Sequence, residues 1–194
     1  MVRNEALEAC LAVIRPLEEL KIDYLVGGSL ASSAHGIPRS TNDADLVVDL
    51  RLGQVPLLVA ALHDDFYLDA DRIRHAVRRK SSFNVIYLPT MFKVDVFLLK
   101  DDPLWREEMR RRQRIVLAED GHAVDVASAE DTVLYKLSWY QISGGTSDRQ
   151  WQDLLGVLKV RRDELDYEYL RRWAAEIGVE ELLSKAVGEA SSSA

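Results

Sequence analysis

Residues 43–50 read Asp-Ala-Asp-Leu-Val-Val-Asp-Leu, a β-strand pattern that carries two carboxylates one residue apart. Side chains two residues apart on a strand point to the same face, so Asp43 and Asp45 would converge on one spot. Carboxylates in an apolar strand are costly unless a cation or hydrogen bonds satisfy them. Two explanations are open: an ordinary solvated strand face, or an oxygen-rich site for a hard divalent cation such as Mg²⁺.

A glycine pair stands before this strand, in the run Tyr-Leu-Val-Gly-Gly-Ser at 24–29. A strand that ends at Gly27 and Gly28, with Ser29 opening a helix, would aim free backbone N–H groups outward, where a phosphate can approach closely. An ordinary turn with a serine cap explains the same residues. No P-loop or dinucleotide-binding motif is formed.

A third carboxylate, Asp95, lies in the apolar run Met-Phe-Lys-Val-Asp-Val-Phe-Leu-Leu at 91–99. It shares a strand face with Lys93, and a local ion pair would satisfy it. Alternatively, Asp95 joins Asp43 and Asp45 around a pair of metal ions. Such a pair can activate a hydroxyl and stabilise the leaving pyrophosphate of an in-line phosphoryl displacement.

The hydrophobic periodicity predicts an α/β segment at 1–127 followed by a helical segment at 128–194 packed against it. Short strands and helices alternate up to residue 127, with antiparallel hairpins at 81–99 and at 113–127, the latter turning at Glu119, Asp120 and Gly121. Helix caps are expected at Asp102 before Pro103, at Ser128 with Asp131, and at Ser147 with Gln150.

Composition narrows the class of protein. The net charge is −7, but residues 72–114 hold twelve Lys and Arg against five Asp and Glu. This basic segment could meet phosphates or RNA, or it could consist of solvated helix faces paired with local acids. No apolar run suits a membrane span or a signal peptide. Cys10 is the single cysteine, which excludes an internal disulfide and fits a reducing cytoplasm.

The order of strand, Gly-Gly-Ser turn, helix, Asp-x-Asp strand and later single-Asp strand resembles the polymerase-β-like nucleotidyltransferase superfamily. Thirteen residues separate Ser29 from Asp43, close to the spacing of about a dozen in that signature. The stretches at 36–48 and 128–158 are similar to small bacterial stand-alone nucleotidyltransferase-fold proteins, a branch near the abortive-infection toxins. The resemblance implies an α/β (α+β) fold with a mixed β-sheet flanked by helices.

By this resemblance, Gly27, Gly28 and Ser29 would hold the phosphates of an NTP. Asp43 and Asp45 would bind two Mg²⁺ or Mn²⁺ ions. Asp95 would bind the catalytic ion and help to deprotonate the acceptor hydroxyl.

Lysine and aspartate residues on C-terminal helices of related toxins face the nucleotide, and Lys136 and Asp153 occupy comparable places. Lys136 shares a helical stripe with Thr132 and Tyr140, opposite an apolar stripe, so it would either meet the triphosphate or be exposed. Arg39, four residues before Asp43, could reach a phosphate in the same way. Asp153 could instead form a surface pair with Arg149.

The sequence therefore favours a metal-dependent nucleotidyltransferase that moves a nucleoside monophosphate to an acceptor hydroxyl. The acceptor could be RNA such as tRNA, a protein or a small molecule. Proximity to the toxin branch implies a toxin role with an antitoxin partner. A non-catalytic NTP-binding or partner-binding module with the same fold is the alternative. The third possibility is a protein that binds nucleic acid through its basic segment and has no catalytic activity.

Overall fold

The computed structural model describes residues 5–117 and 121–192 of the 194-residue chain. It divides into two compact units. Unit 1 contains Met1–Leu30 and Ser40–Val126, and unit 2 contains Ala31–Arg39 and Ala127–Ala194. The chain thus leaves unit 1 after residue 30, returns at residue 40, and leaves again after residue 126.

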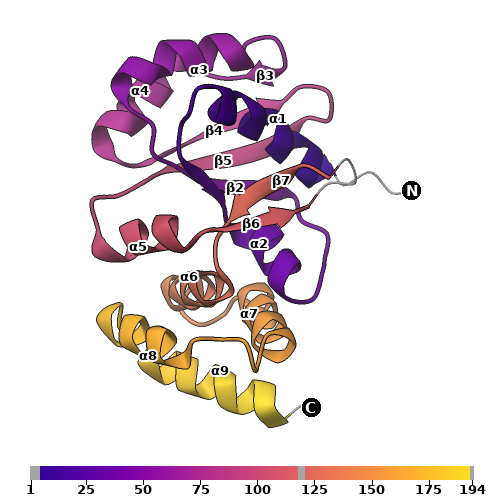
Figure 1. Cartoon of the computed structure of the whole chain (residues 1–194), viewed down its shortest axis with the longest axis vertical. Helices are drawn as coiled ribbons and strands as arrows, with labels where there is room; N and C mark the ends of the chain where they lie inside the picture. The colour runs from indigo at the N-terminus through magenta and orange to yellow at the C-terminus, as the bar shows by residue number, and fades with distance from the viewer. Residues whose placement is uncertain (1–4, 118–120, 193–194) are drawn as a thin grey trace. The chain divides into compact units, whose positions relative to one another are not determined.

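Unit 1 is built on a mixed seven-stranded sheet with the order β3-β4-β5-β2-β1-β7-β6 (Figure 1). The β2–β5 and β1–β7 pairs are parallel, and the other neighbouring strands are antiparallel. This confirms the predicted mixed α/β class. The strands are β1 (Tyr24–Val26), β2 (Asp43–Val48), β3 (Phe66–Tyr67), β4 (Ser82–Tyr87), β5 (Phe92–Leu98), β6 (Gln113–Val116) and β7 (Ala123–Val126).

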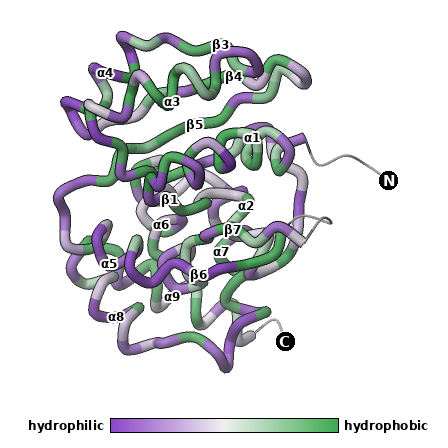
Figure 2. The backbone as a smooth tube through the Cα atoms, turned by 45° about the horizontal axis from the view of Figure 1, so that its top comes forward, coloured by the Kyte–Doolittle hydropathy of each residue, from purple (hydrophilic) through white to green (hydrophobic). Residues whose placement is uncertain are grey.

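Helices of unit 1 supply the apolar surface that the sheet needs. Helix α1 packs against β2 and β5, α4 packs against β4, and α3 contacts both α1 and α4. The buried residues of α1 recur at helical spacing, while β5 is hydrophobic over most of its length (Figure 2). The helices are α1 (Glu5–Glu19), α3 (Val55–Leu62), α4 (Ala70–Arg79) and α5 (Pro103–Arg111), with a 3₁₀ turn at Leu52–Gln54.

The two predicted hairpins form as expected. β4 and β5 pair antiparallel from Ser82 opposite Phe97 to Tyr87 opposite Phe92. β6 and β7 pair antiparallel as well. Residues 118–120, which include Glu119 and Asp120 of the expected turn, lie outside the described residues.

Unit 2 is helical, as predicted for the chain after residue 128. Helix α2 (Gly28–His35) begins in unit 1 and continues into unit 2. In unit 2, α6 packs against α7 and α8, and α9 packs against α7 and α8. These helices are α6 (Ala129–Ile142), α7 (Asp148–Val160), α8 (Tyr167–Glu176) and α9 (Glu180–Ser192). Along the described chain, no helix is both long and apolar enough to cross a membrane.

Helix capping follows the sequence at two of the three predicted positions. The Asp102 carboxylate accepts from the backbone N–H groups of Leu104 and Trp105, and the Ser128 hydroxyl accepts from the Asp131 N–H. The prediction for Ser147 is wrong, because its side chain makes no cap hydrogen bond. Its ψ of 89° differs from the 163° of Ser128, whose extended conformation is the usual one for a helix N-cap.

Candidate functional site

The register of β2 on β5 aligns the three predicted carboxylates. In this parallel pair, Asp45 lies beside Asp95, and Asp43 lies beside Lys93. Neighbouring residues of adjacent strands point to the same face, so all three carboxylates lie on one face of the sheet. The opposite face carries the buried Ala44 and Leu46.

Two of the three carboxylates, those of Asp43 and Asp95, contact polar side chains of unit 1. Asp43, Asp45 and Asp95 are called the carboxylate row below. The Thr41 hydroxyl donates to Asp43 Oδ1 over 3.0 Å. Lys93 Nζ lies 2.5 Å from Asp95 Oδ2, which is the local ion pair weighed from the sequence. The hydrogen bond to Asp95 is the largest effect and raises the pKa of Lys93. Burial opposes it, and the charges of Asp95, Asp43 and Asp45 raise the pKa further. A protein cation therefore already stands among the three carboxylates.

The Gly-Gly step is packed directly against Asp45. Gly28 has a φ of +55°, and a Cβ added there would lie 1.8 Å from Asp45 Oδ2. Only glycine leaves this space open and adopts this conformation without strain. The Gly27 N–H donates to the Asp45 carbonyl over 2.9 Å, and Ser29 is buried. The strand end, the start of α2 and the Asp45 carboxylate thus form one site.

Carboxylate oxygens are the ligands that hard divalent cations prefer, and the strand register places those of Asp43, Asp45 and Asp95 on one sheet face. Among the described residues, however, no three His, Cys, Asp or Glu side chains gather closely enough to hold a metal ion. Asp43 and Asp95 have protein partners of their own, Thr41 and Lys93. Asp43, Asp45 and Asp95 would be the ligands after the Lys93 ammonium moves aside.

In unit 2, the buried Lys136 and Asp153 form an ion triad with the partly exposed Arg39. Arg39 donates through Nε and a terminal nitrogen to the two oxygens of Asp153, over 2.6 and 2.7 Å. Lys136 Nζ donates to Asp153 Oδ2 over 2.7 Å. The Lys136 and Asp153 side chains are 2% and 5% exposed. Burial raises the pKa of the Asp153 carboxyl, but the hydrogen bonds from Arg39 and Lys136 outweigh burial, so that the pKa is lowered.

The structure thus brings the predicted residues together in two sets, each within its own unit. Gly27, Gly28, Ser29, Asp43, Asp45 and Asp95 lie in unit 1, and Arg39, Lys136 and Asp153 lie in unit 2. Lys136 is buried and paired rather than exposed, and Asp153 pairs with Arg39 and Lys136. The roles of these residues toward a nucleotide stay predictions.

Most cations of the basic segment 72–114 are paired with acids. Acidic side chains form ion pairs with Arg74, Lys80, Lys93, Arg106, Arg110, Arg112 and Arg114. This favours the interpretation of solvated, locally paired faces over that of a general RNA-binding surface.

Sequence reasoning missed two polar neighbours of the carboxylate row. Thr41 holds Asp43, and Asn84 of β4 lies beside Asp95 in the antiparallel register. Asn84 lies in the predicted hairpin at 81–99, and a prediction of the hairpin register would have placed it opposite Asp95.

Comparison with solved structures identifies the fold. An antigenic nucleotidyltransferase-like protein from Paracoccidioides brasiliensis matches with a TM-score of 0.57 and 17% identity, over 96% of this chain and 94% of that one. The enzyme ANT(2'')-Ia in complex with adenylyl-2''-tobramycin matches with a TM-score of 0.56 and 13% identity, over 88% and 95% of the two chains. The chain has the nucleotidyltransferase fold.

At these identities the comparisons show the fold alone. No protein-family model matches the sequence, and no curated protein matches it. The case for a particular chemistry therefore depends on the residues of the site.

Proposed function

We propose that this protein is a metal-dependent nucleotidyltransferase, which moves a nucleoside monophosphate from an NTP to an acceptor hydroxyl. The observation that carries this proposal is the placement of Asp43 and Asp45 of β2 and Asp95 of β5 on one sheet face, with Asp45 packed on the Gly28 turn. A nucleotidyltransferase fold with this row at a glycine turn has the groups that the reaction needs.

In the proposed reaction, the acceptor oxygen attacks the α-phosphorus of the NTP. The bond from that phosphorus to the α,β-bridging oxygen breaks, and pyrophosphate leaves. Divalent ions, when bound, supply positive charge that activates the acceptor hydroxyl and stabilises the leaving group. Asp43 and Asp45 would hold these ions, and the Asp95 carboxylate would accept the proton of the hydroxyl. The backbone N–H groups at Gly28 and Ser29, at the start of α2, would orient the phosphates.

The Lys93–Asp95 ion pair favours one alternative, a nucleotide-binding module without catalysis. A lysine at this place reduces the net charge of the row and competes with a metal ion for Asp95. The two functions share NTP binding and differ in transfer, so one experiment separates them.

The test combines binding with transfer. We expect Mg²⁺ with a non-hydrolysable ATP analogue to raise the melting temperature of the wild type, and Asp43→Asn with Asp45→Asn to abolish the rise. Asp49→Asn is the matched control, because Asp49 follows the same strand but lies 3.9 Å from Lys80. A full thermal shift in the double variant would overturn the metal assignment.

Transfer is measured with each α-labelled NTP, Mg²⁺, total RNA and a cell lysate. Label in the RNA or protein fraction would fit a toxin-type enzyme, and label in the small-molecule fraction would fit an enzyme that modifies small molecules. Binding without transfer of any of the four nucleotides would support the module.

A further inference from the structure

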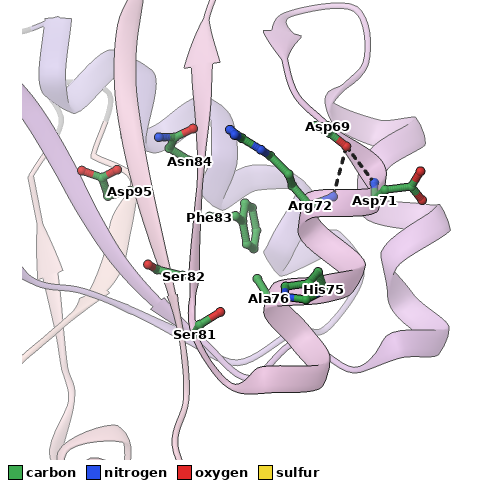
Figure 3. Close-up of a pocket in the computed structure, with 10 residues that line it drawn as sticks. All are labelled: Asp69, Asp71, Arg72, His75, Ala76, Ser81, Ser82, Phe83, Asn84 and Asp95. Carbon is green, nitrogen blue, oxygen red and sulfur yellow. Dashed lines mark hydrogen bonds between the residues drawn. The ribbon is translucent and has the colours of Figure 1, made fainter.

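A cavity of about 480 Å³ opens in unit 1 beside the carboxylate row. It lies between α4 and β4, and Asp95 of β5 stands at its border (Figure 3). Cavities of this size are typical of small-molecule sites. None of the sequence motifs described above accounts for it.

Two residues that line the cavity, Asp95 and Asn84, are in register with Asp45 of the carboxylate row. Asp45 lies beside Asp95 in the parallel register, and Asn84 lies beside Asp95 in the antiparallel register. These three residues therefore form one line over β2, β5 and β4 and point to the same face. A molecule seated at Asn84 would have its nearest groups next to the carboxylate proposed to take a proton.

The strand edge that borders the cavity is open. β3 pairs with β4 only at Tyr87 and Ile86. In the described part of the chain, no strand pairs with the outer edge of β4 at Ser82 or Asn84. Backbone groups at this edge can bind a ligand, and the Ser81 and Ser82 hydroxyls stand beside them.

The acidic side chains that line the cavity are already engaged. The Asp69 carboxylate caps α4 by accepting from the N–H groups of Asp71 and Arg72. Asp71 pairs with Arg74 over 2.7 Å. Asp95 pairs with Lys93. The negative charge of the cavity wall is therefore largely compensated within the protein.

Arg72 supplies positive charge that is not compensated in this way. Among the described residues, its guanidinium has no hydrogen-bond or ion-pair partner, in contrast to that of Arg74. Its side chain extends from α4 toward Asn84 (Figure 3). His75, one turn further along α4, lines the same cavity. A guanidinium with adjacent hydroxyl and amide donors is a recognition set for phosphate.

We propose that this cavity is the acceptor subsite and that it takes a hydroxyl compound carrying a phosphate group. The phosphate would bind to Arg72 with Ser82 and Asn84, and the hydroxyl would lie toward Asp95. This inference depends on the proposed function, since it names the acceptor class of the same reaction. A polycationic aminosugar such as tobramycin, by contrast, would bring like charge to Arg72.

The experiment is a titration of the ¹⁵N-labelled protein, followed by NMR, with ribose 5-phosphate, ribose, the dinucleotide CpA and tobramycin. We expect ribose 5-phosphate to shift the amide signals of residues 81–84, and ribose and tobramycin to leave them unchanged. Arg72→Gln should weaken ribose 5-phosphate binding at least fivefold. Arg74→Gln, on the same helix but paired with Asp71, should change it less than twofold. Tighter binding of CpA would identify an RNA end as the source of the phosphate, and tighter binding of ribose 5-phosphate a free sugar phosphate.

Three results would overturn the proposal: unchanged signals at residues 81–84, equal losses in the two variants, or binding of tobramycin in preference to the sugar phosphate. The thermal shift with Mg²⁺ and the ATP analogue separates this failure from that of the proposed function. Arg72→Gln should keep the full shift. If Asp43→Asn with Asp45→Asn also keeps it while Arg72→Gln loses ribose 5-phosphate binding, the nucleotidyl transfer is wrong and the cavity is an anion site only.

Discussion

Gly28 shows how closely the backbone and the Asp45 carboxylate depend on each other. A methyl group there would both occupy the position of Asp45 Oδ2 and strain a φ of +55°. We expect Gly28→Ala to lower the free energy of unfolding by at least about 1–2 kcal/mol and to abolish the thermal shift with Mg²⁺ and the ATP analogue. Urea unfolding and melting curves measure the two effects.

Gly27→Ala is the control for this substitution. A Cβ at Gly27 would meet nothing closer than the Asp45 carbonyl oxygen at 4.0 Å. The free energy of unfolding of the Gly27→Ala variant should stay the same or rise by up to about 1 kcal/mol. Equal losses in both variants would show that the Gly28–Asp45 contact is not the cause.

Asp153 is the anion that holds two cations in unit 2, so its removal should cost more than the removal of either partner. We expect Asp153→Ala to destabilise the protein by about 3–5 kcal/mol, because Lys136 is left buried beside Arg39 without a counter-charge. Lys136→Met should cost about 1–3 kcal/mol, because Asp153 keeps the hydrogen bonds from Arg39. Urea unfolding gives both values. The reverse order would contradict this account of the triad.

Single site residues could be predicted from the sequence where they interrupt a local hydrophobic pattern. Asp43, Asp45 and Asp95 attract notice as carboxylates in apolar strands. The burial of Lys136 could not be predicted, because its partner Asp153 lies 17 residues away on another helix. A polar helical stripe is expected to face solvent unless a buried counter-charge is known.

The close approach of α2 to α7 depends on Gly36, the residue that follows the helix. A Cβ there would lie 2.7 Å from the Val157 nitrogen and 2.8 Å from the Gly156 carbonyl carbon. Because both neighbours are backbone atoms, Gly36→Ala must push the two segments apart, and we expect a loss of about 1–3 kcal/mol in urea unfolding.

Gly188→Ala is the matched control within unit 2. Gly188 lies inside α9 with nothing within 4 Å of an added Cβ. The substitution should stabilise the protein by about 0.5–1 kcal/mol through helix propensity. Destabilisation by Gly188→Ala would mean that α9 has a neighbour at this position.

His35, the last residue of α2, links the stability of unit 2 to pH. Burial lowers its pKa below the usual 6.5, although the hydrogen bond to the Ala127 carbonyl acts against this. The carbonyl can only accept, so Nε2 donates over 2.7 Å, and the lowered pKa keeps the ring neutral at pH 7. Below pH 6.5 the unfolded chain binds a proton that the folded chain does not, so stability should fall as the pH falls through this range.

Unfolding by urea at pH 7.5, 6.5 and 5.5 tests this dependence. His35→Gln should be less stable at pH 7.5 and show a shallower decline with falling pH. An unchanged decline in the variant would assign the dependence to other groups.

At the level of elements, local signals predicted most helices and both hairpins, because a short connection leaves few ways to pair two strands. The parallel strand pairs could not be predicted from the sequence. β2 lies beside β5, and β1 lies beside β7, across long intervening stretches of chain. The row of carboxylates needs the first of these pairings, so the site was inferred from residue types before its geometry was known.

The unfolding of the two units can be followed with different probes, a thiol in unit 1 and tryptophans that lie mostly in unit 2. Cys10 is completely buried in unit 1, and burial, with a smaller effect of the Asp45 charge, raises the pKa of its thiol to about 12. It should be unreactive in the folded protein. Unit 2 holds three of the four tryptophans: Trp139, Trp151 and Trp173.

We expect pulse labelling of Cys10 and tryptophan fluorescence to give the same urea midpoint. Helix α2 is continuous and divides its residues between the units, so the unfolding of one unit frays an element of the other. A reaction of Cys10 at a urea concentration clearly different from the fluorescence midpoint would show that the units unfold separately.

The membership of residues 31–39 in unit 2 has a consequence for synthesis on the ribosome. Arg39 emerges 114 residues before its partner Asp153. At about 5–20 residues per second, this interval lasts roughly 6 to 23 seconds. During that time the second half of α2 lacks the helices on which it packs in the finished protein. Unit 2 can therefore form only after its later helices have been made, around a segment that was synthesised well before them.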